Sequence, residues 1–357
     1  MTKPGTATAA LMAAILAFLP LPAAAQDMLN YKGADREQKL IAGAKKEGAV
    51  VFYSAMIENQ ALRPIVDAFE KKYPFIHMTY WRGDTEDIIA RVSAEVRSRN
   101  VVADVIEGTD VGELGTSAHL LAPYYSPMIA QYPQNERDPR GIWTPTRISY
   151  FSIAYNTHLV PPGEAPKTFQ DLLNPKWKGK MVWRVGTSSG APLFITNLRI
   201  AWGEARANAY FQKLKDQQIV NFGSGSARTL VDRTLAGEYS IALNIFAHHP
   251  LISKMAGAPV DSRLMDPVAA TAATMGVAIG AHHPCAAMLL ADFILSKEGQ
   301  QIMAGAQYFP ARPDVPPEAQ LASVVPANAH VRENFISPAT LLKYTASSQK
   351  IVQELFR

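Results

Sequence analysis

Residues 49–106 read AVVFYSAMIENQALRPIVDAFEKKYPFIHMTYWRGDTEDIIARVSAEVRSRNVVADVI. Three short runs rich in apolar and β-branched residues, 49–53, 75–81 and 101–106, have the length of buried strands. Between these runs, apolar residues recur every three or four positions, as on the buried face of a helix. The segment therefore predicts the order strand, helix, strand, helix, strand. This order is typical of an open, mostly parallel sheet with helices on both faces.

The charges at the helix ends support this prediction. Lys71 and Lys72 suit the C-terminus of the first helix, and Asp84 is expected to cap the second, with Glu86 and Asp87 in its first turn. A further amphipathic helix is expected at about 35–46, before the first strand.

The same alternation returns later in the chain without any repeat of the residues themselves. The elements expected there are strands at 180–185, 219–222 and 239–245, a helix that starts near Pro192, and helices at 209–215 and 227–236.

Two long β-prone stretches, 143–156 and 269–279, flank this second unit. They indicate that the chain leaves a first lobe, builds a second and returns. The fold class expected is α/β with two lobes, each an open mixed, mostly parallel sheet flanked by helices, joined by two hinge crossings. The boundaries expected are 26–146 for the first part of lobe 1, 147–268 for lobe 2, and 269–357 for the return to lobe 1 and the C-terminal helices.

The first 25 residues have the pattern of an export signal. Lys3 precedes an uncharged apolar run, 9–21, which is shorter than the roughly 20 residues that a bilayer-spanning helix needs. Ala23-Ala24-Ala25 is the small-residue pattern that signal peptidase recognises. We expect cleavage after Ala25 and a location in the periplasm.

Composition excludes several classes of function. The chain has 357 residues, 35 Lys+Arg against 31 Asp+Glu, and a formal net charge of +4 at pH 7. No basic run accompanies this small charge, so no nucleic-acid partner is expected. The lone Cys285 can form no internal disulfide, and no Cys/His spacing indicates a metal site. No nucleotide-binding motif is present, and we expect a monomer without a cofactor.

Ligands of open α/β sheets bind beyond the carboxyl ends of the strands, where helix N-termini supply N–H groups. In the second lobe these places are Gly-Thr-Ser-Ser-Gly-Ala at 186–191 and Gly-Ser-Gly-Ser at 223–226. Such loops suit the oxygens of a phosphate, phosphonate or carboxylate, although their residues could also serve only as caps and turns. The arginines that could reach the same space are Arg82, Arg147, Arg184 and Arg228.

Several segments together resemble the extracytoplasmic solute-binding proteins of ABC importers, in particular the ferric-ion-binding-like branch. That branch also includes binders of phosphorylated sugars, phosphonates and polyamines. The resemblance covers most of the mature chain and implies a type 2 periplasmic binding fold, a ligand clamped between two lobes, and an ABC permease of the inner membrane as partner. The matching segments are 50–54, 82–84, 103–106, 154–157, 177–180, 186–190, 236–238 and 296–300.

The iron binders of this branch hold Fe³⁺ with two adjacent tyrosines after the strand that matches 240–245, together with a synergistic anion. Here that place reads Asn-Ile-Phe-Ala-His-His at 244–249, without the tyrosine pair. The segment that supplies a carboxylate ligand in the iron binders reads Gly-Thr-Asp at 108–110. Imidazoles replace phenolates poorly for a hard ferric ion. A retained anion loop without the iron ligands points to a small organic anion.

Three alternatives remain open at this point. The branch includes ferric-ion and polyamine binders, and Glu107 and Asp110 are carboxylates that a polyamine could use. The segment 186–190 also fits the G-x-S-x-G pattern of a serine hydrolase that uses Ser188, for which Asp266 with His282 or His283 is the order-compatible triad. His248 and His249 could bind a transition metal, but cleft lining or helix capping suits two adjacent histidines better.

We expect a binding protein rather than an enzyme, with no catalytic or metal-ligating residues. Hydroxyls and N–H groups of Ser188, Ser189, Gly190 and Ala191 are expected to hold the anionic group, with Ser226 and Arg228 assisting. The complete set of ligand-binding residues expected is Ser54, Arg82, Thr109, Arg147, Tyr150, Thr187, Ser188, Ser189, Gly190, Ala191, Ser226, Arg228, Phe246 and His248.

Overall fold

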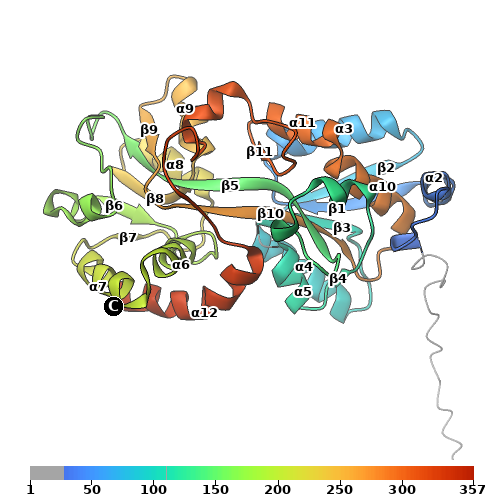
Figure 1. Cartoon of the computed structure of the whole chain (residues 1–357), viewed down its shortest axis with the longest axis horizontal. Helices are drawn as coiled ribbons and strands as arrows, with labels where there is room; N and C mark the ends of the chain where they lie inside the picture. The colour runs from blue at the N-terminus through green and yellow to red at the C-terminus, as the bar shows by residue number, and fades with distance from the viewer. Residues whose placement is uncertain (1–27, 110) are drawn as a thin grey trace, which may run out of the picture.

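The structure is a computed structural model that describes residues 28–109 and 111–357. The expected export signal lies outside these residues. Two long strands, β5 (Trp143–Asn156) and β10 (Val268–Ala278), run side by side through the middle of the molecule (Figure 1). They pair antiparallel and coincide with the two β-prone stretches, so they form the crossings between the lobes. The two-lobed α/β fold class expected from the sequence is confirmed.

In the first lobe, the strand order is β2–β1–β3–β10–β5. The first three strands pair in parallel, and β10 joins β3 antiparallel. The strands are β1 (Ala49–Ser54), β2 (His77–Arg82) and β3 (Val105–Thr109), with the short β4 (Leu121–Ala122), β11 (Phe309–Pro310) and β12 (Glu333–Phe335) at β10 and β5.

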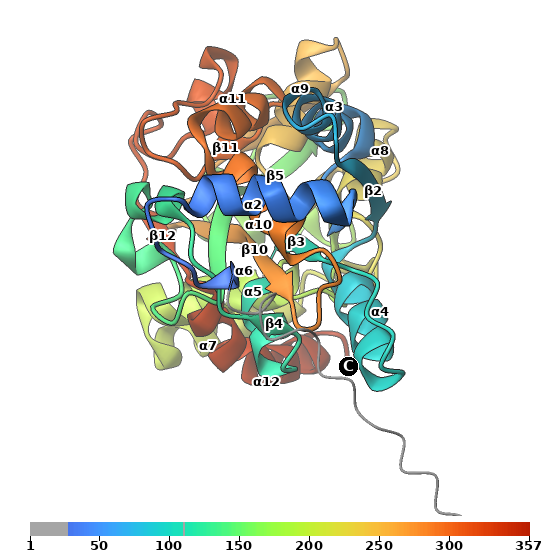
Figure 2. The same cartoon turned by 90° about the vertical axis from the view of Figure 1, so that its right-hand side faces the viewer.

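Helices cover both faces of this sheet (Figure 2). Val50 and Phe52 of β1 pack in one apolar cluster with α3 and α10, whereas Tyr53 packs in another with Ile88 and Val92 of α4. Because alternate side chains of a strand point to opposite faces, both faces must be apolar, as the continuous apolar run in 49–53 indicated. The helices are α2 (Arg36–Glu47), α3 (Arg63–Lys72), α4 (Thr85–Arg97), α5 (Val111–Ser117), α10 (Pro284–Leu295) and α11 (Lys297–Gly305).

The second lobe repeats this arrangement in the order β5–β8–β6–β7. Trp183 packs on the face covered by α6 and α7, and its neighbour Val182 packs on the face covered by α8. The elements are β6 (Met181–Trp183), β7 (Val220–Asn221), β8 (Ile241–Phe246), β9 (Val260–Arg263), α6 (Ala191–Trp202), α7 (Glu204–Lys215), α8 (Ala227–Leu235) and α9 (His248–Met255).

Two features differ from the expectation. The third strand begins at Val105, because the Glu95 carboxylate accepts hydrogen bonds from the N–H groups of Val102 and Ala103 at 2.9 and 3.2 Å and holds them in a loop. The C-terminal helix α12 (Pro338–Leu355) packs along α6, where Ser348 Oγ lies 2.8 Å from Thr196 Oγ1. The last helix therefore belongs with the second lobe (Figure 1).

Among the described helices, none has both the length and the apolar character that crossing a membrane requires.

A buried carboxylate ties the first strand to α10. Asp104 is fully buried and accepts hydrogen bonds from the N–H groups of Val51 and His283 at 2.8 and 2.9 Å. Its second contact with His283, to Nδ1 at 2.8 Å, raises the pKa of that imidazole. The protonated form of His283 therefore stabilises the fold below its unfolded pKa, and this contribution is lost as pH rises through the folded pKa.

We predict that His283→Gln lowers the free energy of unfolding by about 1 kcal/mol at about pH 6 and by less at about pH 8. Urea unfolding at both pH values measures this difference. His282→Gln, at an exposed neighbouring position, is the matched control. An equal effect of His283→Gln at the two pH values would contradict the role given to the Asp104 pair.

Candidate ligand-binding site

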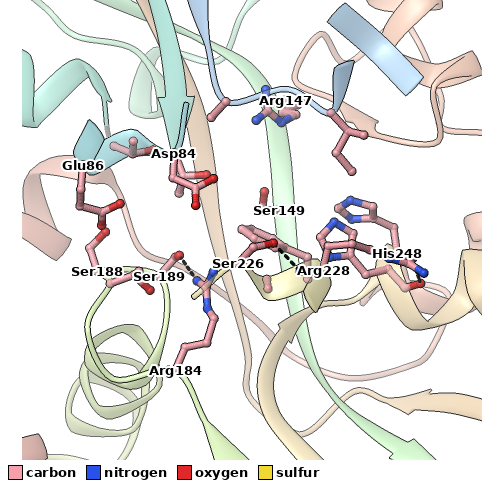
Figure 3. A pocket seen from close by; sticks show the side chains of 18 of the residues that line it. Asp84, Glu86, Arg147, Ser149, Arg184, Ser188, Ser189, Ser226, Arg228 and His248 are labelled. Atoms are coloured by element: carbon pink, nitrogen blue, oxygen red, sulfur yellow. Dashed lines mark hydrogen bonds between the residues drawn. The ribbon is translucent and has the colours of Figure 1, made fainter. Parts of the chain in front are cut away.

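A cleft of about 740 Å³, including the part open to solvent, lies between the lobes beside β5 (Figure 3). Three helices begin at it: α4 from the first lobe, and α8 and α9 from the second. Helix N-termini carry partial positive charge, so their convergence favours a negative ligand. The lining residues are Ala55, Ile57, Arg82, Asp84, Thr85, Glu86, Thr109, Arg147, Ser149, Arg184, Thr187, Ser188, Ser189, Ser226, Ala227, Arg228, Phe246, His248, His249 and Tyr308.

The loop 184–190 folds back on itself before α6. The N–H of Ala191 donates to the carbonyl of Arg184 at 2.7 Å, and the N–H of Gly190 donates to the carbonyl of Thr187 at 3.1 Å. A Cβ at Gly190 would lie 2.2 Å from the Arg184 carbonyl oxygen, so this close return requires glycine. Asn244, within β8, donates to the carbonyls of Ser189 and Gly190 at 2.9 and 3.0 Å and fixes the loop.

This loop directs a buried arginine into the cleft. Arg184 is 6% exposed, and its Nη2 donates to Ser189 Oγ at 2.8 Å, while its Nε has no partner. Within the described part of the chain no carboxylate forms an ion pair with Arg184. Burial lowers the pKa of Arg184, and the more distant negative charges of Glu86 and Asp84 partly offset that effect. A buried cation without a counterion is costly unless a ligand supplies the negative charge.

The other three arginines at the cleft are paired. Arg147 contacts the buried Glu107 and lies over the Tyr308 ring, 4.9 Å from its centroid. Arg82 pairs with Asp84 at 2.9 Å, and Arg228 pairs with Asp232 at 2.8 Å. They add positive field to the cleft, but only Arg184 combines burial with the lack of an ion pair in the residues described.

Two adjacent histidines close one side of the cleft. The rings of His248 and His249 lie 4.4 Å apart in the first turn of α9, and both side chains are buried. Neither ring nitrogen of His248 has a hydrogen-bond partner, nor does Nδ1 of His249. Burial, followed by the charges of Arg147 and Arg228, lowers the pKa of His248 to about 3. Burial and the neighbouring positive charges also hold the pKa of His249 well below its ordinary value.

Many of the expected side chains meet at this cleft. The expected residues that line it are Arg82, Thr109, Arg147, Thr187, Ser188, Ser189, Ser226, Arg228, Phe246 and His248.

Two expected residues point elsewhere. Ser54 Oγ is fully buried and donates to Glu107 at 2.7 Å beneath the cleft. The Tyr150 ring packs against Phe309, 4.9 Å between centroids. Successive side chains of a strand point to opposite faces, so Ser149 lines the cleft with Arg147, and Tyr150 does not. This alternation could have been applied to the sequence.

The N–H groups of Gly190 and Ala191 were expected to bind the anionic group of the ligand. In the structure both N–H groups instead donate to carbonyls within the loop. The Ser226 hydroxyl caps α8 by accepting from the N–H groups of Arg228 and Thr229, at 3.1 and 3.5 Å. Gly190, Ala191 and Ser226 therefore serve as cap and turn residues, the alternative that the sequence left open. Thr187 Oγ1, in contrast, is buried without a hydrogen-bond partner.

Several residues in or near the cleft have roles that the sequence did not assign to them. Asp84 and Glu86 were assigned to the helix start, yet both line the cleft. Glu107 holds Arg147, and Asn244 holds the loop, through contacts between distant parts of the chain. Glu107 lies inside β3 and Asn244 inside β8, so the rule that selects strand ends does not single out these contacts.

The hydrolase triad is not assembled around Ser188. His283 contacts Asp104, and neither Asp266 nor His282 lines the cleft that Ser188 lines. Within residues 28–109 and 111–357, no three His, Cys, Asp or Glu side chains are arranged to hold a metal ion. The lining residues supply hydrogen-bond donors, four arginines and two carboxylates.

Residues 102–332 match the model of a bacterial extracellular solute-binding protein. The chain belongs to this family. Members of the family bind small ligands and deliver them to ABC permeases. Among curated relatives, the Fe(3+)-binding periplasmic protein of Serratia marcescens is 23% identical over 270 residues, which cover 73% of this solute-binding protein and 77% of the relative.

Two solved structures share the fold. A Trichodesmium protein (IdiA, FutA) in complex with iron and citrate is 22% identical, with a TM-score of 0.67 over 86% of this chain and 99% of that one. AfuA from Actinobacillus pleuropneumoniae, with fructose-6-phosphate bound, is 24% identical, with a TM-score of 0.68 over 87% and 96%. The same fold thus holds different ligands in different proteins.

The depressed histidine pKa values make the fold sensitive to acid. Unfolding restores the ordinary pKa of about 6.5, so the unfolded state binds the extra proton and stability falls as pH drops below that value. We predict that the free energy of unfolding of the natural protein falls between pH 7 and pH 5 by about 2 kcal/mol more than that of His248→Gln.

Urea unfolding at the two pH values tests this prediction. His158→Gln, at an exposed position, serves as control. If the natural protein and His248→Gln lose the same stability on acidification, His248 is not a buried neutral imidazole.

Proposed function

We propose that this solute-binding protein captures a small organic anion, bearing a phosphate, phosphonate or carboxylate group, between its lobes and delivers it to an ABC importer. The observation that carries the proposal is the buried guanidinium of Arg184, which forms no ion pair within residues 28–109 and 111–357, at a cleft where three helices begin. The protein would act without covalent chemistry, as a monomer exported to the periplasm.

The donors around Arg184 suit the oxygens of such a group. Thr187 Oγ1 and the ring nitrogens of His248 are buried and need partners, and a multiply charged anion can accept several charge-assisted hydrogen bonds at once. Closure of the lobes would remove water from the ligand and strengthen these bonds. The hinge of β5 and β10 would allow the ligand to select the closed form.

Ferric ion is the second candidate, because the curated relatives are named for iron. Asp84, Glu86 and the two histidines are the cleft residues with suitable donor atoms, but no three of these described side chains are arranged to hold a metal ion. The positive field of four arginines disfavours a bare cation, so iron would need to arrive with an anion, as iron and citrate do in the Trichodesmium structure.

We predict that Arg184→Met weakens binding of glycerol 3-phosphate by about 100-fold, because two charge-assisted bonds are lost. The ligand-free variant should be at least as stable as the natural protein, since it no longer buries an unpaired charge. Calorimetric titration measures the affinity, and urea unfolding measures the stability.

Arg233→Met is the matched control, because Arg233 pairs with Glu238 outside the cleft. Unchanged affinity in Arg184→Met would exclude Arg184 from the site. A thermal-shift screen of sugar phosphates, phosphonates, carboxylates, polyamines, Fe³⁺ and ferric citrate identifies the class of ligand by the rise in Tm. A rise with Fe³⁺ alone and with none of the anions would contradict the proposal.

We also predict that Ser188→Asp abolishes anion binding without unfolding the protein, because it adds a negative charge to the cleft. Titration with glycerol 3-phosphate and the far-UV circular dichroism spectrum report the two properties. Ser188→Ala is the control for loss of the hydroxyl. Specific labelling of Ser188 by a fluorophosphonate would instead support the hydrolase alternative.

A further inference from the structure

The cleft has two chemical sides. Its basic groups come mainly from the second lobe and β5, whereas two carboxylates, Asp84 and Glu86, come from the start of α4 in the first lobe. Figure 3 shows Asp84 pointing into the cleft toward Arg184, and Glu86 opposite Ser188. An anion bound at Arg184 therefore has carboxylates as near neighbours.

Helix capping does not explain this placement of Asp84. The residue occupies the N-cap position of α4, yet its side chain makes no cap hydrogen bond and pairs with Arg82 at 2.9 Å instead. Asp87, in the same first turn, is exposed and does not line the cleft, whereas Glu86, which is also exposed, does. Both carboxylates thus face the ligand space, Asp84 while paired with Arg82 and Glu86 without an ion pair among the described residues.

We propose that the ligand carries a positively charged amine in addition to its anionic group, and that Asp84 and Glu86 bind this amine. The inference rests on the proposed function and specifies the ligand of the same site as a zwitterion. The anionic end lies against Arg184, and the ammonium end lies against the first lobe, so each lobe holds one end.

The unsatisfied groups of the second lobe support this polarity. Arg184 Nε, Thr187 Oγ1 and His249 Nδ1 belong to residues that are more than nine-tenths buried, and none of these atoms has a partner. They require an anionic or strongly polar group. A ligand with only negative charge would satisfy them but would be repelled by the two carboxylates, and a polyamine would be repelled by the arginines. A zwitterion is attracted at both ends.

Two ligands of the same shape separate these cases. Phosphoethanolamine and n-propyl phosphate differ in an ammonium group that replaces a methyl group, so the ratio of their affinities isolates the amine. We expect phosphoethanolamine to bind the natural protein about tenfold more tightly in calorimetric titration at neutral pH. Asp84→Asn and Glu86→Gln should each reduce this ratio, while the affinity for n-propyl phosphate rises. Asp87→Asn is the control and should change neither affinity.

The outcomes distinguish the inference from the function on which it rests. Equal affinities for the two ligands, with both binding, would overturn the inference and leave anion capture standing. Equal tightening of both ligands by Asp84→Asn would also overturn it, because the carboxylates would then be counterions of the arginines only. Binding of neither ligand, together with no anion in the thermal-shift screen, would remove the proposed function itself.

Discussion

The burial of the Arg184 guanidinium without a carboxylate partner among the described residues is the constraint on which the cleft depends. The loop 184–190 closes on itself through Gly190 and Ala191, and the Arg184 side chain lines the interlobe space. Burying an unpaired charge costs several kcal/mol unless the site is completed by an opposite charge. An anionic ligand, as proposed above, would complete the site in this way.

The two-lobed architecture explains why Arg184 faces a space that both lobes line. β5 is common to both sheets and carries Arg147 and Ser149 on the side of the cleft and Tyr150 on the other. Helices α4, α8 and α9 start at the same place because the strands that precede them end there. Most of the basic groups consequently come from the second lobe and β5, whereas the two carboxylates and Arg82 come from the first lobe.

The sequence predicted the fold well because apolar periodicity reports local structure. The strands and helices within 49–106 and the full span of β5 follow from the pattern of apolar residues in each segment itself. The strand-end rule also found most of the cleft. The rule could not assign roles to individual atoms. The pairing of Glu107 with Arg147 depends on residues distant in the chain. The hydrogen bonds of Gly190 and Ala191 and the direction of the Asp84 side chain depend on the local conformation of the backbone and the side chain. Relatives named for iron share the fold, but the pair of tyrosines expected of iron binders is missing from 244–249.

A crystal structure of the protein with a bound phosphate monoester tests the central claim most directly. We predict that the phosphate oxygens lie within hydrogen-bond distance of the Arg184 guanidinium and of Thr187 Oγ1, with the lobes closed around the ester. A ligand bound outside the interlobe cleft, or a cleft filled by iron on Asp84, Glu86 and His248 while Arg184 stays unpaired, would contradict the account.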